Sequence, residues 1–424
     1  MEFKLPRGTT DILPEEVAIW QYIEGEIKEL CHRFNYLELR TPMFEHTELF
    51  RRGVGETTDV VEKEMYTFLD KGDRSLTLRP EGTAGLVRSY VENKMHGLPQ
   101  QPVKLYYVGP MFRYERPQAG RNRQFTQFGV EAIGAKDASI DAEVIAMAME
   151  FYKKLGLQGM RLEINSVGCP TCRPKHKEAL IAHLKDRRDE LPEEDRSRLE
   201  RNPLRVLDSK HPVTQELTKG APSILDYLCD DCGEHFEQLQ SYLTAMSIPF
   251  HVNPRMVRGL DYYTQTAFEI IIEGFGAIGT VCGGGRYNGL VQQIGGENVP
   301  GIGFGLGIER VILALKTQKV DIPIKSSIDC YLVALGDEAK AKGVSLVQEW
   351  RLAGLSVDQD YLSRNMKPQL KSADRLQATF VAILGSNELE QEIVVLKRMD
   401  TGEQIELAYA EALDRMLKEI KKED

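Results

Sequence analysis

The segment Arg258-Gly259-Leu260-Asp261-Tyr262-Tyr263-Thr264 places a cation, a carboxylate and two phenols just before an apolar run from Ala267 to Ile272. These side chains could line a pocket for a small, polar ligand that carries a ring. The same residues could form a turn with two packed tyrosines, since short motifs also occur by chance. Other motifs along the chain decide between the two interpretations.

A second polar cluster is expected on a β-hairpin formed by Met111 to Arg116 and Phe125 to Ile133. Side chains alternate between the two faces of a strand, so polar residues two apart share a face. The residues that should share faces are Arg113 and Glu115 on the first strand, and Gln127, Gly129 and Glu131 on the second. A half-buried floor of such groups is costly unless a ligand or partner groups satisfy it. A solvated sheet face is the alternative, and the apolar residues in between argue against it.

Two further segments have the composition of phosphate-binding sites. The loop from Pro117 to Arg123 supplies Arg121 and Arg123, and guanidinium groups match phosphate oxygens. A merely solvated loop is the alternative. Gly301 to Arg310 alternates glycine with apolar residues and then turns helical, which allows a close backbone approach and places Arg310 in the first turn of a helix.

The element pattern predicts how these motifs are held. An amphipathic helix is expected after Pro14, followed by a short strand from Tyr36 to Pro42. Strand-like runs follow, several of them joined by short turns, at 76–78, 105–108, 111–116, 125–133, 268–272 and 302–304. We therefore expect an α+β fold whose largely antiparallel sheet is flanked by helices.

Two regions depart from this pattern. Residues 170–250 are charged, helix-favouring and poor in strand signals, so we expect a helical insertion within a first domain of residues 1–324. A linker-like stretch at 318–327 then precedes a fresh alternation of strands and helices. Residues 325–424 are therefore expected to form a separate α/β domain.

Composition limits the class of protein. The chain of 424 residues is 42% hydrophobic and 28% charged, as in ordinary soluble globular proteins, and its net charge is -10. A nucleic-acid contact would therefore need local basic patches. No signal core and no membrane-length apolar stretch is apparent, so we expect a cytoplasmic location without a membrane partner. The segment Gly274 to Gly279 matches a dinucleotide fingerprint, but the residues after it, TVCGGG, cannot form the required helix.

Together these motifs resemble a known class of enzymes. Phe112 to Glu115, the basic loop and the strand that ends in Glu309-Arg310 resemble motifs 2 and 3 of class II aminoacyl-tRNA synthetases. Tyr36 to Pro42 resembles motif 1, which builds the dimer interface in that class. Three segments resemble signatures of histidyl-tRNA synthetases of bacterial type: RGLDYYTQTAFE at 258–269, CGGGRYNGL at 282–290 and TLRPEGT at 77–83.

The resemblance implies a class II catalytic core that is homodimeric and an anticodon-binding domain at 325–424. Its substrates would be L-histidine, ATP with Mg²⁺, and tRNA(His). Histidine would be joined to the α-phosphate of ATP and then transferred to the 3′-terminal adenosine of the tRNA, with catalysis mostly by positioning and charge stabilisation. The matching ATP positions are Arg113, Glu115, Arg121, Arg123, Phe125 and Arg310, and the matching histidine positions are Glu81, Thr83, Gln127, Glu131, Arg258, Tyr262 and Tyr263.

The resemblance also implies individual roles. Arg113 would hold the α-phosphate and the attacking carboxylate, while Glu115 and Phe125 would contact adenine. Arg310 would hold the terminal phosphates. Arg258 would carry fixed positive charge beside the reacting phosphate, so Arg113 and Arg258 are the expected catalytic residues.

The C-terminal domain carries a basic stripe that could contact tRNA. It consists of Arg364, Lys367, Lys371 and Arg375, which fall on one face of an expected helix. A solvated helix face is the alternative. Which residues contact which bases does not follow from the sequence.

Four cysteines form two C-x-x-C pairs, Cys169 with Cys172 and Cys229 with Cys232, the ligand spacing of a structural zinc site. The pairs are far apart in sequence and lie in the insertion, away from the expected chemistry. Zinc and a reduced cluster without metal both stay open, with the metal-free cluster favoured. Members of the family vary here, so the resemblance does not settle the question. His176, His183, His211 and His235 show no catalytic spacing and are expected to be surface or capping residues.

Three functions are compared. The first is histidine-tRNA ligase. The second is a silent relative, the regulatory subunit of ATP phosphoribosyltransferase, which usually lacks the C-terminal domain and the arginines at positions 113, 258 and 310. Because all of these are present here, we expect the ligase. A synthetase for another amino acid is opposed by the RGLDYYT segment.

Overall fold

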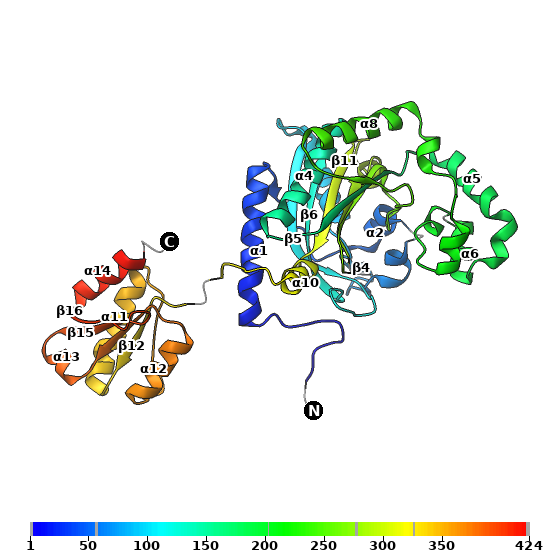
Figure 1. Ribbon diagram of the computed structural model, residues 1–424. Coiled ribbons are helices and arrows are strands. Elements are labelled where there is room, and N and C mark those ends of the chain that lie inside the picture. The colour runs from blue at the N-terminus through cyan, green and yellow to red at the C-terminus, as the bar shows by residue number, and fades with distance from the viewer. Residues whose placement is uncertain (1–2, 56–57, 202, 276–278, 325–326, 421–424) are drawn as a thin grey trace. The chain divides into compact units, whose positions relative to one another are not determined.

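The computed structural model describes residues 3–55, 58–201, 203–275, 279–324 and 327–420 (Figure 1). It divides into two compact units, Met1–Ile322 and Pro323–Asp424. The sequence had placed this division after residue 324. Among the described residues, no helix is long and apolar enough to cross a lipid bilayer.

An eight-stranded sheet lies at the centre of the first unit, in the order β1-β5-β6-β11-β10-β9-β7-β8. Neighbouring strands pair antiparallel, apart from the edge pairs β1 with β5 and β7 with β8, which are parallel. The strands are β1 (Leu37–Glu38), β5 (Val103–Phe112), β6 (Gln124–Ile133), β7 (Met160–Ser166), β8 (His251–Val252), β9 (Thr264–Ile272), β10 (Thr280–Arg286) and β11 (Gly301–Gly307). The predicted α+β class with an antiparallel-dominated sheet is confirmed.

The two faces of this sheet differ in composition because side chains alternate along each strand. On β6, Phe128 and Val130 belong to the main hydrophobic core, while Gln127 and Glu131 face the other way and line a cavity. On β11, Ile302 is buried in the same core, whereas the glycines that alternate with it face the cavity. One face is therefore apolar, while the other carries the polar cavity beside a second hydrophobic core that includes Val103, Leu105 and Ile133.

Helices cover the apolar face. They are α1 (Pro14–Arg33), α4 (Ala138–Lys154), α8 (Asp230–Ala245) and α10 (Ile308–Gln318), seen beside the sheet in Figure 1. The predicted first helix is present as α1, whose Trp20, Ile23 and Ile27 are buried at helical spacing. The side chain of Asp137 caps α4 by accepting a hydrogen bond of 2.8 Å from the Ser139 amide.

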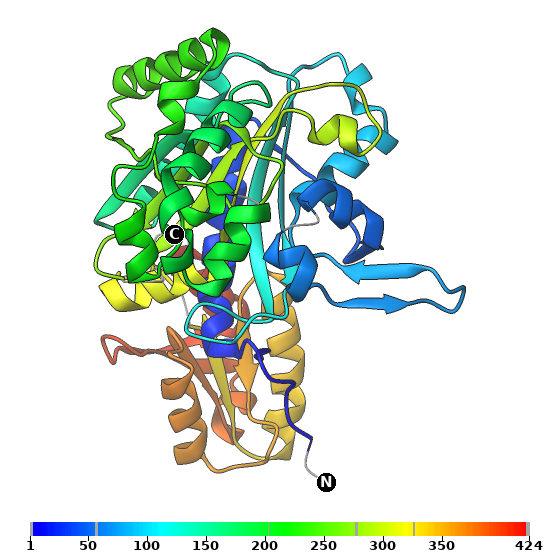
Figure 2. The same cartoon turned by 90° about the vertical axis from the view of Figure 1, so that its right-hand side faces the viewer.

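A smaller, three-stranded sheet lies beside the open face. It contains β2 (Phe44–His46), β4 (Ser75–Leu78) and β3 (Thr67–Leu69), and the β3–β4 hairpin projects sideways in Figure 2. The associated helices are α2 (Thr47–Val54), η1 (Val60–Glu64), α3 (Thr83–Glu92), η2 (Met95–Gly97) and α9 (Leu290–Gln293). The TLRPEGT segment runs from β4 into the first residue of α3, so it delivers its polar side chains to the open face of the large sheet.

The structure differs from the predicted β5–β6 hairpin in one respect. β5 is a single strand that ends at Phe112, so Arg113 and Glu115 follow the strand and do not share one of its faces. The reason is that the Tyr114 amide donates to the carbonyl of Glu64 at 2.7 Å, which turns the backbone away from β6. The pocket nevertheless receives both side chains.

Helices fill most of the predicted insertion. They are α5 (Arg173–Leu184), η3 (Lys185–Glu190), α6 (Glu193–Arg201), η4 (Pro203–Val206), α7 (Pro212–Leu217) and η5 (Ile224–Tyr227). They pack around a small core of Leu180, Leu184, Leu191, Leu199, Val206, Leu207 and Leu217. In contrast, α8 lies within the predicted range of 170–250 but buries Phe236, Leu239 and Leu243 in the main core.

The second unit is an α/β domain, as predicted. Its sheet has the order β13-β12-β14-β15-β16, parallel in the first half and antiparallel in the second. The elements are β12 (Cys330–Ala334), α11 (Asp337–Leu352), β13 (Val357–Gln359), α12 (Met366–Arg375), β14 (Phe380–Leu384), α13 (Ser386–Glu390), β15 (Ile393–Arg398), β16 (Gln404–Ala408) and α14 (Tyr409–Ile420). The sequence did not reveal β13, β16 or α14.

The predicted basic stripe is only partly helical. Lys367, Lys371 and Arg375 lie exposed on α12, but Arg364 precedes the helix. The Arg364 side chain forms an ion pair with Asp360, which also accepts the Arg364 amide at 2.8 Å. This local turn fixes Arg364 before the helix begins.

Candidate active site

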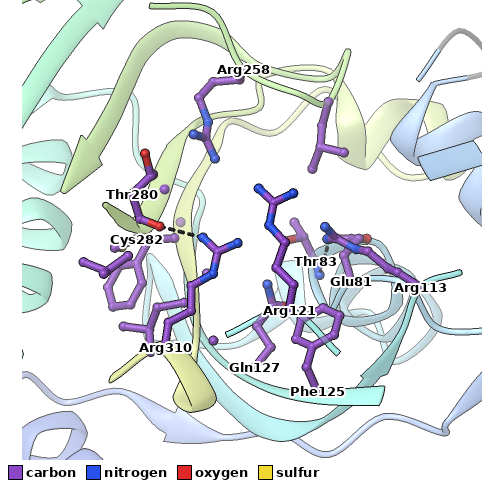
Figure 3. Close-up of a pocket in the computed structure, with 18 of the residues that line it drawn as sticks. Glu81, Thr83, Arg113, Arg121, Phe125, Gln127, Arg258, Thr280, Cys282 and Arg310 are labelled. Carbon is purple, nitrogen blue, oxygen red and sulfur yellow. Dashed lines mark hydrogen bonds between the residues drawn. The ribbon is translucent and has the colours of Figure 1, made fainter. Parts of the chain in front are cut away.

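A cavity with about 1030 Å³ of empty space, including its mouth, opens on the polar face of the large sheet. The β4–α3 junction, the β5–β6 loop, the segment before β9, and strands β10 and β11 all contribute to its lining. Figure 3 shows four arginine side chains directed into this space: Arg113 and Arg121 from the β5–β6 loop, Arg258 from the segment before β9, and Arg310 from α10. The predicted site residues in its lining are Glu81, Thr83, Arg113, Glu115, Arg121, Phe125, Gln127, Glu131, Arg258, Tyr262, Tyr263 and Arg310.

A buried acidic cluster forms one end of the cavity. Glu81 accepts hydrogen bonds of 2.8 Å from the amides of Thr83 and Ala84, at the N-terminus of α3. The Thr83 hydroxyl donates to Glu131 Oε1 at 2.6 Å. Burial raises the pKa of the Glu81 carboxyl, and the two amide donors act in the opposite direction. The cluster thus places two carboxyl groups and a hydroxyl within reach of one small cation.

Glu131 is the more strongly perturbed of the two acids. Its side chain is 1% exposed, and burial raises the pKa of this carboxyl to about 8. Glu131 Oε2 is buried and has no hydrogen-bond partner among the described residues. Since a buried polar atom of this kind is costly, it suits a ligand that brings its own hydrogen-bonding group.

Tyrosine rings form the adjoining wall. The rings of Tyr262 and Tyr263 lie 4.7 Å apart between centroids, and Tyr287 lies 5.9 Å from Tyr262. Burial raises the pKa values of Tyr262 and Tyr263, so both hydroxyls stay neutral. On β5, the Tyr107 hydroxyl donates to Gln127 Oε1 at 3.2 Å. A ring-bearing ligand would find stacking surfaces and neutral hydroxyl groups together here.

Arg258 stands between this wall and the rest of the cavity. Its guanidinium forms an ion pair with Glu269 and lies 5.3 Å from the centroid of the Tyr263 ring. Burial alone would lower the pKa of Arg258, but Tyr263 and Glu269 outweigh it and raise the pKa above its ordinary value. Arg258 therefore supplies a fixed positive charge inside the cavity.

Arg113 and Arg121 share a carboxylate at the opposite side. Arg113 Nη1 lies 3.7 Å from Glu115 Oε1, and Arg121 Nη1 lies 3.5 Å from Glu115 Oε2. Arg113 Nε donates to the Pro80 carbonyl at 2.8 Å, and its guanidinium lies 5.4 Å from the centroid of the Phe125 ring. The arrangement combines an aromatic surface, an acceptor and two guanidinium groups, which suits a nucleotide.

Arg310 completes the set of cations in the cavity. It lies in the first turn of α10, where Arg310 Nη1 donates to the Thr280 carbonyl at 2.6 Å and Nε to the Gly120 carbonyl at 3.3 Å. Burial and the nearby Arg121 lower the pKa of Arg310. Arg123, which was also expected here, is not among the lining residues; its guanidinium lies 3.8 Å from the centroid of the Tyr114 ring.

A family model described as histidyl-tRNA synthetase matches residues 8–311. The chain belongs to this family. A second model, described as an anticodon binding domain, matches residues 329–419. Together the two models account for the cavity-bearing unit and the C-terminal unit.

Full-length relatives of this synthetase family agree. The chain is 60% identical over 416 residues to a histidine–tRNA ligase of Geobacillus sp. strain WCH70, with 98% of each protein covered. A histidine–tRNA ligase of Bacillus cytotoxicus is also 60% identical, over 96% of this chain and 97% of that protein. The crystal structure of apo S. aureus histidyl-tRNA synthetase has a TM-score of 0.84 at 45% identity and covers 98% of this chain and 100% of that one.

Sequence reasoning assigned no role to several lining residues of the synthetase site. Cys282, Gly283 and Tyr287 line the cavity and lie within the segment CGGGRYNGL at 282–290. The motif therefore predicted that this segment belongs to the site, but it gave no role to these three residues. Tyr107 and Glu309 also line the cavity. Glu309 could have been found from its position beside Arg310; it accepts the Thr126 amide at 2.8 Å, and burial raises its pKa to about 7.

The four cysteines of the C-x-x-C pairs come together at the base of the insertion. Their Sγ atoms all lie within 4.8 Å of one another. The cluster is nearer to the site than the sequence suggested, because Arg173 donates to the carbonyl of Tyr263 and Gln265 Nε2 lies 3.8 Å from Cys232 Sγ. Two cysteine pairs that are distant in sequence therefore meet beside the tyrosine wall.

Two of the four histidines differ from the prediction, while His183 and His211 are exposed as expected. His176 is fully buried, and its Nε2 lies 2.8 Å from the Pro222 carbonyl. His235 is 9% exposed and pairs with the buried Asp141 at 2.8 Å. Helix packing places these two rings inside the protein, where each has a polar partner.

The dinucleotide-like segment, Gly274 to Gly279, is only partly described. Residues 276–278 lie outside the described part of the chain. The residues that follow, Thr280–Arg286, form β10. A pyrophosphate-binding helix therefore does not begin here, as the sequence predicted.

Proposed function

We propose that this cavity carries out both chemical steps of histidine charging. The carboxylate of histidine attacks the α-phosphate of ATP, which forms the acyl phosphate bond of histidyl adenylate and expels pyrophosphate. The ribose hydroxyl of the 3′-terminal adenosine of tRNA(His) then takes the histidyl group and releases AMP. The observation that carries this proposal is that Arg113, Arg121, Arg258 and Arg310 converge on the same cavity as the Glu131 and tyrosine wall.

Histidine would bind at the acidic end. Its α-ammonium group would meet Glu81, Thr83 and Gln127, which offer oxygen acceptors within one corner of the cavity. Its imidazole would lie against the wall formed by Tyr262 and Tyr263 and share a proton with Glu131 Oε2. An amino acid without a polar ring would leave that buried oxygen unpaired, which is a strong basis for selectivity.

Arg258 would offset the negative charge that develops when carboxylate and phosphate approach each other. Its ion pair with Glu269 and its packing on Tyr263 hold the guanidinium in place before substrate arrives. Charge that is already positioned needs no rearrangement during the reaction, so it lowers the barrier more than a mobile side chain does. We assign to Arg113 the same task from the ATP side.

ATP would occupy the arginine-rich side of the cavity. Adenine would stack on Phe125 and donate its amino group to Glu115, while Arg310 would hold the terminal phosphates. In the present arrangement Glu115 is engaged with Arg113 and Arg121, so ATP binding would separate these ion pairs and free both guanidinium groups for phosphate. Arg123 would reach ATP only if its contact with Tyr114 is released.

Mg²⁺ would accompany the phosphates and neutralise part of their charge. Glu309 Oε2 lines the same side, is buried and has no hydrogen-bond partner among the described residues. A carboxylate oxygen is the kind of ligand that Mg²⁺ takes. Glu309 thus fits a Mg²⁺ ion that arrives with ATP.

The C-terminal unit would bind the anticodon region of tRNA(His). Its match to an anticodon-binding family and the exposed cations on α12 support this role. Lys367, Lys371 and Arg375 are available for phosphate contacts, whereas Arg364 is engaged with Asp360. Recognition of unstacked loop bases by a separate small domain is usual for RNA-binding proteins.

A homodimer is supported by apolar side chains exposed around β1, β2 and β3. Leu37 is 66% exposed and Leu69 is 65% exposed, and Met43, Phe44 and Phe68 are also exposed. A patch of this kind is unusual on a monomer unless a partner covers it. We expect Leu37→Glu to yield monomers in analytical ultracentrifugation, and Leu352→Glu on α11 to leave the dimer intact; a monomeric unmodified protein would contradict the dimer.

A cytoplasmic location is likewise proposed, to be tested by cell fractionation.

The deciding experiment is amino-acid-dependent exchange of pyrophosphate into ATP, run with each amino acid in turn. Exchange with histidine alone supports the proposal. Histidine binding without exchange would favour the rival regulatory function, since a protein named as ATP phosphoribosyltransferase regulatory subunit/histidyl-tRNA synthetase from Bacillus halodurans shares the fold with a TM-score of 0.63 at 22% identity. The arginines in the cavity and the anticodon-binding family match favour the ligase.

A further inference from the structure

We propose that Cys169, Cys172, Cys229 and Cys232 bind one structural zinc ion that closes the base of the helical insertion. The four Sγ atoms lie within 4.8 Å of one another and come from two segments distant in sequence. Cys169 and Cys172 lie between β7 and α5, and Cys229 and Cys232 lie at the start of α8. From the sequence alone a metal-free cluster was favoured. The proximity of the four sulfur atoms now favours a zinc site.

Two of the sulfur separations are close to those of a tetrahedral site, and the others are at most 4.8 Å. Zinc–thiolate bonds of about 2.3 Å in a regular tetrahedron place sulfur atoms about 3.8 Å apart. The Sγ of Cys169 lies 3.5 Å from that of Cys172 and 3.8 Å from that of Cys229. A disulfide requires about 2.05 Å, and all seven cysteines are free. Four sulfur ligands without nitrogen or carboxylate ligands favour zinc over harder divalent cations.

Backbone groups around the cluster are placed as they would be around thiolate ligands. The Thr171 amide donates to Cys169 Sγ at 3.4 Å, and the Cys229 amide donates to Cys172 Sγ at 3.2 Å. Such donors stabilise and orient metal ligands from outside the coordination shell. Gly168 has a φ of +66°, and a Cβ there would stand 2.8 Å from Cys172 Cβ, so the turn needs glycine.

The local charges are compatible with a zinc tetrathiolate, whose net charge is negative. Arg173 directly follows Cys172 and brings a cation to the cluster. Asp230 and Asp231, between the second pair, are exposed, so water screens their charge. The charges around the cluster therefore permit four cysteine thiolates to bind one metal ion.

A metal at this position would stabilise a part of the protein that has a small core. The insertion from Arg173 to Leu228 leaves the main unit and returns to it at the two cysteine pairs. Among its described residues, its own core consists of seven buried aliphatic side chains with Leu204 and Ala221 packed against them. Small cores of this size commonly need a metal or disulfide to stay folded. Closing both ends of the insertion at one ion would supply that constraint.

The same ion would also steady the tyrosine wall. Arg173 Nε donates to the Val167 carbonyl at 3.0 Å, and another of its nitrogens donates to the carbonyl of Tyr263. The Val167 amide donates to the Gln265 carbonyl at 2.7 Å, and the Gln265 amide donates to the Gly168 carbonyl at 3.0 Å. Segment 167–173, which carries the first cysteine pair, is thus bonded to the backbone that presents Tyr263.

The test is the metal content of the full-length protein purified without chelator. We expect about one zinc per chain, and its loss in Cys169→Ser/Cys172→Ser. Cys330→Ala, in the C-terminal unit, is the matched cysteine control and should retain zinc. Replacement by Co²⁺ should give the thiolate-to-cobalt charge-transfer bands and intense visible bands of tetrahedral sulfur coordination. Iron in place of zinc, substoichiometric metal with four alkylatable thiols, or a Cys169–Cys172 disulfide would each overturn the proposal.

A second measurement covers the case in which the double variant does not fold. Zinc is removed from the unmodified protein with a chelator, and limited proteolysis follows cleavage within residues 173–228. We expect cleavage about tenfold faster in the stripped protein, restored by Zn²⁺ but not by Mg²⁺. Equal cleavage rates with and without metal would contradict a structural role.

Zinc binding should also affect histidine binding, and this expectation rests on the proposed function. The zinc site itself does not depend on that function. If the zinc steadies Tyr263, the stripped protein should have a raised KM for histidine and a nearly unchanged KM for ATP in pyrophosphate exchange. Bound zinc with no effect on the histidine KM would leave the metal site standing and refute only this link. Absence of exchange in every preparation would instead count against the ligase.

Discussion

Gly283 lies against the guanidinium of Arg258, so closely that a Cβ on Gly283 would stand 2.2 Å from Arg258 Nη2. Glu269, which pairs with Gly283 in the β9–β10 register, holds the same guanidinium by an ion pair. The position of the proposed catalytic charge therefore depends on a residue without a side chain. This relationship explains why the glycine run in β10 belongs to the site.

Gly283→Ala should displace Arg258 and slow adenylate formation. We expect a loss of about 10- to 100-fold in kcat for pyrophosphate exchange, because small displacements of a positioned group are costly in catalysis. Gly259→Ala is the control, since no heavy atom lies within 4 Å of a Cβ at that position. Equal activities of the two variants would show that the Arg258 position does not matter.

Arg258→Ala should lower the rate of adenylation far more than it weakens histidine binding. Removal of one preorganised charge from a water-poor site costs about 10²- to 10³-fold in rate. Single-turnover adenylation and equilibrium histidine binding, measured on the same preparation, separate the two effects. Equal losses in both would mean that Arg258 binds substrate without stabilising the transition state.

Glu131→Gln should stabilise the protein at alkaline pH. The pKa of Glu131 is about 8 in the folded protein and near 4.5 when unfolded. Below the unfolded value both states hold the proton and burial carries no charge penalty. As pH rises towards the folded value the unfolded state releases its proton first, so stability falls, by on the order of 3 to 5 kcal/mol in total above that value.

The variant lacks this titration, so its advantage over the unmodified protein should grow between about pH 5 and pH 9. Denaturant unfolding at several pH values measures it. Glu24→Gln, at an exposed position on α1, controls for a general loss of negative charge. A constant difference between Glu131→Gln and the unmodified protein across this range would argue against a protonated Glu131.

Lys367→Glu/Lys371→Glu should impair tRNA use without affecting amino-acid activation. Both side chains are exposed on α12. Reversal of two phosphate-facing charges should raise the KM for tRNA(His) about tenfold at low salt, with a smaller effect at high salt. Pyrophosphate exchange should be unchanged, and Lys418→Glu, at an exposed position on α14, serves as the control. Unaltered aminoacylation kinetics would identify the α12 cations as a solvated helix face.

Particular residues show where sequence reasoning succeeded and where it did not. Glu131 and Gln127 were placed together because strand alternation depends only on local geometry. Arg113 and Glu115 were assigned to a strand, and the structure moved them into a loop because the Tyr114 amide pairs with Glu64, a contact between distant segments. His235 was expected at the surface, and its burial depends on α8 packing against α4 and Asp141.

The sequence by itself determined the family, the antiparallel core, the helical insertion and the residue types of the cavity, because motifs and hydrophobic periodicity are local properties of the chain. Only the tertiary structure decided which of these residues meet. The Glu131 carboxyl gains its raised pKa from burial by other segments, the Arg258 guanidinium is held against Gly283, and the four cysteine sulfurs converge from the two ends of the insertion. Burial and proximity between distant residues arise when the chain folds, and they set the chemistry of side chains that the sequence can only name.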